Sequence, residues 1–67
     1  MEKIFNNEKY YYIKKYEFKF GIVYKFANLY KCKYCIEKNG EFIEIKNPIK
    51  LKKIQNEFYK IEIEDII

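Results

Sequence analysis

The sequence predicts an α+β fold, a small antiparallel meander of three to four strands with one C-terminal helix packed on the sheet. Three observations support it. Apolar and polar residues alternate through the first half of the chain, an Asn-Gly pair stands at residues 39 and 40, and Asn47-Pro48 opens a helical pattern. The length of 67 residues suits one domain, so residues 1–67 are expected to form a single domain.

The first strands are predicted from the even positions between residues 10 and 36, which are apolar except at Lys14 and Asn28. Such alternation is typical of half-buried strands, and the even side chains should form the core face. One strand of that length is implausible, so the chain must turn. We expect the turn at Phe20-Gly21, because glycine tolerates the geometry, and a further break near Ala27-Asn28 is an alternative. The expected strands cover about 10–19, 22–34 and 41–46, with the second extending to residue 38.

The Asn39-Gly40 pair predicts a two-residue hairpin turn, in which both central residues need a positive φ. The turn would pair Lys38 with Glu41, Ile36 with Ile43, and Tyr34 with Ile45. The first pair joins opposite charges, and the other two bring apolar residues together on one face. The turn chemistry and the apolar pattern therefore predict the same register.

The C-terminal helix is predicted to begin at Asn47-Pro48, because Asn is a good N-cap and Pro suits the first helical position. An apolar stripe with spacings of three, four and three residues follows, formed by Leu51, Ile54, Phe58 and Ile61. We expect this stripe to pack on the even, aromatic face of the sheet.

Two segments allow an alternative. Residues 61–64 alternate between apolar and acidic, so they fit either the end of the helix or a short strand. Residues 7–18 also fit a helix, since Tyr12, Tyr16 and Phe20 are spaced by four. The run of aromatic residues favours a strand there.

Cys32 and Cys35 are separated by two residues, a spacing found in zinc and redox sites. A structural zinc ion needs four ligands, whereas this chain has two Cys and no His. The predicted register places Cys32 among the core aromatic residues and Cys35 on the outer face, opposite Glu44. We expect ordinary thiols and no cofactor, and these cysteines are weak candidates for a metal shared across a dimer.

The net charge is +4 and the sequence pI is about 9.0, which favours an anionic partner. Every basic residue is Lys, and the absence of Arg disfavours reading of base edges. Lys33 would lie opposite Lys46, a like-charge pair that suits a bound anion. The alternative is that the lysines only keep the sheet soluble. The candidate partner-binding residues on the outer face are Lys15, Lys19, Lys25, Lys31, Lys33, Lys46 and Tyr11.

Catalysis is not expected, since the chain has no Ser, Thr, His or Arg. The residue types correspond to AT-rich codons, as in a low-GC bacterium, its phage or another mobile element. The N-terminus lacks the apolar run of a signal peptide, and no stretch approaches ~18 apolar residues, so a cytoplasmic protein without a membrane span is expected.

The function expected from these observations is protein binding by a small inhibitor or adaptor, which would occlude a host protein that handles nucleic acid or acts in defence. The alternative is non-specific binding of nucleic acid by the face rich in Lys and Tyr. The oligomeric state is left open by the sequence.

Overall fold

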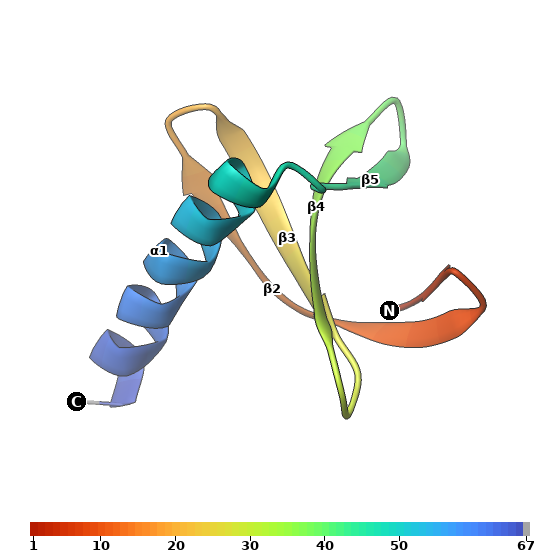
Figure 1. The fold of residues 1–67 in the computed structure, drawn as a ribbon, viewed down its shortest axis with the longest axis horizontal. Helices are drawn as coiled ribbons and strands as arrows, with labels where there is room; N and C mark the ends of the chain where they lie inside the picture. Colours follow the sequence, from red (N-terminus) through yellow and green to blue (C-terminus); the bar gives the residue numbers. More distant parts are fainter. Residues whose placement is uncertain (67) are drawn as a thin grey trace.

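The computed structural model describes residues 1–66, which form a curled antiparallel sheet and one helix (Figure 1). The elements are β1 (Glu2–Phe5), β2 (Glu8–Phe18), β3 (Gly21–Ala27), β4 (Cys32–Lys38), β5 (Glu41–Glu44) and α1 (Pro48–Ile66). Each strand pairs with its neighbours along the chain, in the order β1-β2-β3-β4-β5. The predicted α+β class is confirmed, but the sheet has five strands instead of three to four.

The strand that the sequence did not predict is β1, which joins β2 through Asn6 and Asn7. Both residues have a positive φ, of 50° and 65°, and Phe5 pairs with Glu8 across the turn. Asn adopts this left-handed conformation more readily than other residues with a side chain. The Asn-Asn pair therefore supplies the two positive φ angles of this hairpin turn, as Asn-Gly does in the second hairpin, although it is the weaker sequence signal.

The predicted hairpin at Asn39-Gly40 is confirmed. Lys38 pairs with Glu41 and Ile36 with Ile43, while both turn residues have a positive φ. The predicted pairing of Tyr34 with Ile45 is also present, because the amide of Ile45 donates to the carbonyl of Tyr34 at 2.8 Å.

The turn expected around Phe20-Gly21 is present one residue earlier, at Lys19-Phe20, and the break near Ala27-Asn28 is also found. Gly21 begins β3 with a φ of 140°, a value that side-chain-bearing residues rarely adopt, and Phe18 pairs with it across the turn. Residues 28–31 separate β3 from β4, so the long second strand is two strands. Residues 8–18 are extended, so the helical alternative for that segment is wrong.

A β-bulge at Ile13 changes which face each residue of β2 occupies. Tyr12 pairs with Phe26 and Lys14 with Lys25, so Ile13 is one extra residue on β2. Side chains of paired residues lie on the same face of a sheet. Even positions therefore lie on one face before the bulge and on the other face after it, and the expectation of one apolar even face is wrong.

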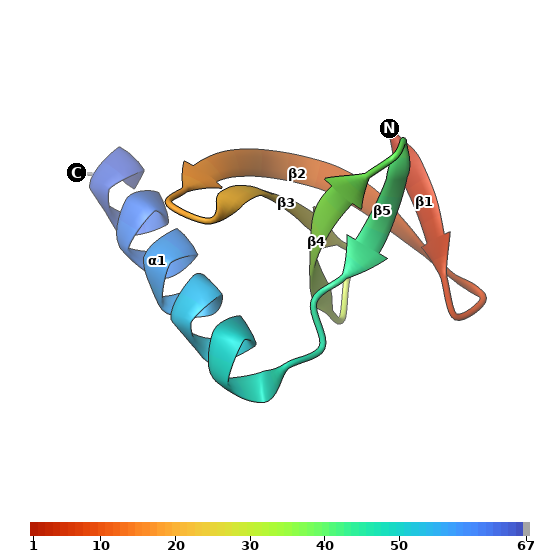
Figure 2. The ribbon, with the colours of Figure 1, turned by 90° about the horizontal axis from the view of Figure 1, so that it is seen from above.

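The sheet has a core on each face. The inner face of the curl holds the buried residues Tyr10, Phe26 and Cys35. Phe5 of β1 and Phe42 of β5 both contact the Phe26 ring, with centroids 5.7 Å and 5.1 Å away, so the two edge strands curl toward each other around it (Figure 2). We call the opposite surface the helix face, because α1 packs there on Val23, Tyr34 and Ile45.

The helix begins as predicted and packs through the predicted stripe. The Asn47 side chain accepts hydrogen bonds from the amides of Ile49 and Lys50 at 3.0 Å and 3.1 Å, which makes Asn47 the N-cap. Ile54 and Phe58 are buried, and the Phe58 ring contacts rings of β2 and β4.

The open question about residues 61–64 is resolved, since they continue the helix. The stripe does not pack on even aromatic residues alone, because Val23 and Ile45 also lie under it. Within residues 1–66, no helix has the length and apolar character that a membrane span requires.

Candidate functional site

The structure does not gather the six candidate lysines on one face. Lys25 lies on the helix face and forms an ion pair with Glu62 of α1. Burial lowers the pKa of Lys25, but the hydrogen bond to Glu62 and nearby negative groups outweigh it, so the pKa is raised overall. Lys31 Nζ lies 3.3 Å from Glu8 Oε1. Two of the six charges are thus compensated, on different sides of the molecule.

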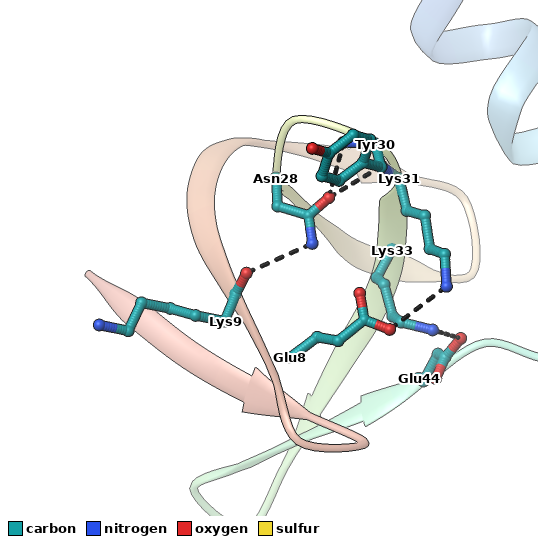
Figure 3. Close-up of polar contacts among 7 residues, drawn as sticks. All are labelled: Glu8, Lys9, Asn28, Tyr30, Lys31, Lys33 and Glu44. Atoms are coloured by element: carbon teal, nitrogen blue, oxygen red, sulfur yellow. Dashed lines mark hydrogen bonds and ion pairs between the residues drawn. The ribbon is translucent and has the colours of Figure 1, made fainter.

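Lys33 forms a third pair, and its partner is Glu44 instead of an external anion (Figure 3). Its Nζ lies 3.0 Å from Glu44 Oε2, and both side chains are mostly buried on the inner face. The hydrogen bond to Glu44 raises the pKa of Lys33. The expected pair with Lys46 is not formed, because β5 ends at Glu44 and Lys46 is exposed beyond it.

The other candidate lysines are exposed and separate. Lys15 pairs in register with Tyr24, which places it on the side of the inner face, whereas Lys19 lies in the β2–β3 turn. The expectation of one lysine-rich outer face is therefore wrong. The cause is the pairing register between strands: Lys15 pairs with Tyr24 and Lys25 pairs with Tyr34, so odd positions of one strand share a face with even positions of the next.

The two cysteines lie on opposite faces of β4, but the expected assignment is reversed. Cys35 is fully buried beside Tyr10 and Phe26, and Cys32 is exposed at the start of the strand. Burial raises the pKa of Cys35 to about 11, which disfavours the thiolate that binds metal. Among the residues whose side chains are described, no three His, Cys, Asp or Glu side chains cluster as metal ligands.

The β3–β4 loop is held by the side chain of its first residue. Asn28 Oδ1 accepts hydrogen bonds from the amides of Tyr30 and Lys31, both at 2.9 Å (Figure 3). The backbone amide of Asn28 donates to the Lys31 carbonyl at 3.0 Å, and the side-chain Nδ2 of Asn28 donates to the Lys9 carbonyl at 3.4 Å. Asn side chains stabilise tight turns in this way. The loop therefore has a defined conformation and is tied to β2.

This loop presents two apolar side chains to solvent. Leu29 is 93% exposed and Tyr30 is 86% exposed, while Tyr11 on β2 is 48% exposed. Tyr11, Leu29 and Tyr30 line a shallow hollow of about 330 Å³, and we call these three residues the loop patch. Tyr11 was a candidate from the sequence, but Leu29 and Tyr30 were missed. The available signal was an apolar pair directly after the predicted break at Asn28.

Neither a protein-family model, nor a curated protein, nor a solved structure matches this chain. The fold and the site define a small α+β domain that carries an apolar loop, held by hydrogen bonds of Asn28, at one end of its sheet.

Proposed function

We propose that the chain is a non-enzymatic protein-binding domain, an inhibitor or adaptor that contacts its partner through the loop patch. The observation that carries this proposal is the exposure of Leu29 and Tyr30 on a loop fixed by Asn28. A preorganised loop loses little conformational entropy on binding. Tyr is enriched among the residues that dominate protein interfaces, and burying a leucine side chain contributes about 1.5–3 kcal/mol.

A protein partner fits the patch better than nucleic acid does. Leu29 has neither a ring to stack on a base nor a polar group to pair with one. Lys9, which lines the hollow, is paired with Glu2, and Lys31, which follows Tyr30, is paired with Glu8. The pairs of Lys25 and Lys33 further reduce the charge available for phosphates. The net charge of +4 favours a partner surface of negative potential, because such charges speed encounter and orient docking.

The proposed mode of action is occlusion. The chain lacks Ser, Thr, His and Arg, so binding itself is the effect that it exerts on its partner. A host protein that handles nucleic acid is the partner class proposed on the basis of composition, in keeping with an origin in a phage or mobile element.

The experiment is capture of partners from a lysate of an AT-rich bacterial host, with and without nuclease treatment, followed by affinity measurement with the purified partner. The test variant is Leu29→Ala/Tyr30→Ala. The matched control is Ile4→Ala/Tyr59→Ala, which removes one aliphatic and one tyrosine side chain that are 67% and 66% exposed elsewhere. Circular dichroism checks that both variants fold.

The proposal predicts one protein retained in equimolar amount after nuclease treatment. The loop variant should weaken its binding at least ~10-fold, the equivalent of ~1.4 kcal/mol, and the control should bind like the original chain. Equal binding by the loop variant would contradict the site. Retention of mixed nucleic acid alone would contradict the function and favour direct phosphate binding by lysines.

A further inference from the structure

A second hollow lies at the opposite end of β3, between the β2–β3 turn and the first half of α1. We call it the turn groove. Its volume is about 400 Å³, within the range of about 300–1,000 Å³ that is typical of small-molecule sites. The residues on which its chemistry depends are Phe18, Phe20, Ile49, Lys50, Lys53 and Ile54.

The floor and rim of the turn groove are apolar. The rings of Phe18 and Phe20 stack with centroids 5.5 Å apart and planes 8° from parallel. Ile54, which also lines the groove, is buried, whereas Phe20 and Ile49 are 54% and 71% exposed. A ligand in the groove would remove apolar surface of Phe20 and Ile49 from water, which is the main source of affinity in such sites.

The charged groups of the turn groove favour an anion. Lys50 Nζ lies 4.9 Å from the centre of the Phe20 ring. Among the side chains that the structure describes, no carboxylate forms an ion pair with Lys50 or Lys53. Glu57 also lines the groove, but its carboxylate lies 3.6 Å from Lys60 Nζ. The first turn of α1 contains no acidic residue, so the positive potential of the helix N-terminus adds to the two ammonium groups.

We propose that the turn groove binds a small carboxylate with an apolar body, such as an aliphatic acid. The apolar body would lie against Phe20 and Ile49, and the carboxylate would lie between Lys50 and Lys53. An uncharged apolar molecule would leave both ammonium groups without a counter-charge, and an inorganic anion would leave the exposed ring and the isoleucine uncovered. The combination of an apolar floor and two lysines that form no ion pair with the described side chains therefore selects an amphipathic anion.

The test is a nuclear magnetic resonance titration of the isotope-labelled full chain with three probes. Octanoate has both features of the proposed ligand, octanol has the apolar body without the charge, and acetate has the charge without the body. Octanoate should give saturable shifts of the amide signals of the groove residues. Octanol should bind at least ~5-fold more weakly, about 1 kcal/mol, and acetate should not saturate.

Two variants locate the carboxylate. Lys50→Gln/Lys53→Gln should abolish the preference for octanoate over octanol, since it removes both ammonium groups. The control Lys38→Gln/Lys52→Gln removes the same charge from exposed positions outside the lining and should keep the preference. The Leu29→Ala/Tyr30→Ala variant should bind octanoate normally, because the loop patch lies at the other end of β3.

Three results would overturn the proposal: no saturable shift with octanoate, equal affinity for octanol, or shifts centred on the loop patch. An unchanged preference in the Lys50→Gln/Lys53→Gln variant would also overturn it. None of these results contradicts the proposed binding of a protein partner by the loop patch, so the two proposals fail independently.

Discussion

Tyr12 and Tyr16 lie four residues apart on β2, yet their rings pack in two different cores. Tyr12 contacts Phe26 on the inner face with ring centroids 5.9 Å apart, and Tyr16 contacts Phe58 of the helix with centroids 5.4 Å apart. The extra residue at Ile13 makes this possible, because it exchanges the faces of the even positions midway along the strand. One continuous strand thereby supplies aromatic side chains to both sides of the sheet.

The bulge predicts an asymmetry between two single-residue deletions in β2. Deleting Ile13 would leave Tyr12 and Lys14 adjacent and paired with adjacent residues of β3, so every side chain keeps its face. We expect this variant to fold, with a loss of about 1–2 kcal/mol in the free energy of unfolding from reduced curl.

Deleting Glu17 instead would reverse the orientation of Tyr16 and direct it away from Phe58, and Lys15 would replace it on the helix face. The free energy of unfolding should fall by at least ~3 kcal/mol more than in the Ile13 deletion, because a charged side chain replaces a core ring. Urea denaturation followed by circular dichroism measures both losses. Equal decreases in the free energy of unfolding would show that the bulge does not determine which face each side chain of β2 occupies.

The pair between Lys33 and Glu44 predicts that reversing the charge of Lys33 destabilises the domain. The Lys33 and Glu44 side chains are only 16% and 22% exposed, so Lys33→Glu would place two partly buried carboxylates together. We expect a loss of about 1–3 kcal/mol, largely recovered in the swapped variant Lys33→Glu/Glu44→Lys. Thermal unfolding measures the four members of this cycle.

The matched control for that cycle is Lys31→Glu, which disrupts a pair whose side chains are 58% and 45% exposed. Exposed pairs contribute at most about 1 kcal/mol, so this variant should unfold close to the temperature of the original chain. A harmless Lys33→Glu substitution would contradict the pairing.

Cys35 predicts loss of stability at alkaline pH. Burial raises its pKa to about 11, from an ordinary value of 9.0. Between these pH values the unfolded chain releases the thiol proton and the folded chain keeps it, so the free energy of unfolding falls as the pH rises. The fall should approach about 2–3 kcal/mol above pH 11 and be absent below pH 8.

The measurement is the urea midpoint as a function of pH for the original chain and for Cys35→Ala. This variant has no thiol at residue 35, so it should not show the part of the alkaline fall that Cys35 causes. Cys32→Ala is the matched control, since Cys32 is exposed and should leave the alkaline fall unchanged. Lys25 and Lys33 have raised pKa values, so their pairs are also lost as the pH rises through those values, in all three proteins alike. Identical curves for Cys35→Ala and the original chain would contradict the assigned burial.

The Asn47 cap predicts different effects for two substitutions. Asn47→Ala removes the acceptor for the amides of Ile49 and Lys50 and should cost about 1 kcal/mol. Asn47→Asp keeps an acceptor and adds negative charge at a helix end whose first turn has no acidic residue, so stability should be equal or higher by up to ~1 kcal/mol. Thermal unfolding at low and high salt distinguishes them, and a destabilising Asn47→Asp would contradict the cap geometry.

Local features of this fold were predictable because their physical causes are local. The hairpin at Asn39-Gly40 depends on backbone conformations that those two residues adopt readily, and the register beyond it follows from side-chain alternation. The helix start at Asn47 depends on one side chain and two adjacent amides. The first hairpin has the same kind of cause, but Asn6-Asn7 is a less distinctive pair than Asn-Gly.

The candidate site was predictable only in part. Tyr11 was identified from its position on a strand, whereas Leu29 and Tyr30 depend on a loop whose shape is set by the Asn28 side chain. The candidate lysines were identified by alternation, but their partners Glu62, Glu8 and Glu44 come from other elements. Contacts between distant segments cannot be inferred from the period of one strand.

The sequence by itself determined the α+β class, the second hairpin and its register, the helix cap and the apolar stripe of the helix. Only the tertiary structure decided that the sheet curls, that it is covered on both faces, and that Cys35 instead of Cys32 is buried. The physical reason is that alternation specifies which residues of one strand share a face. The pairing register between strands, the bulged residue in β2 and the packing of Phe5 and Phe42 on Phe26 determine which of those faces is inside.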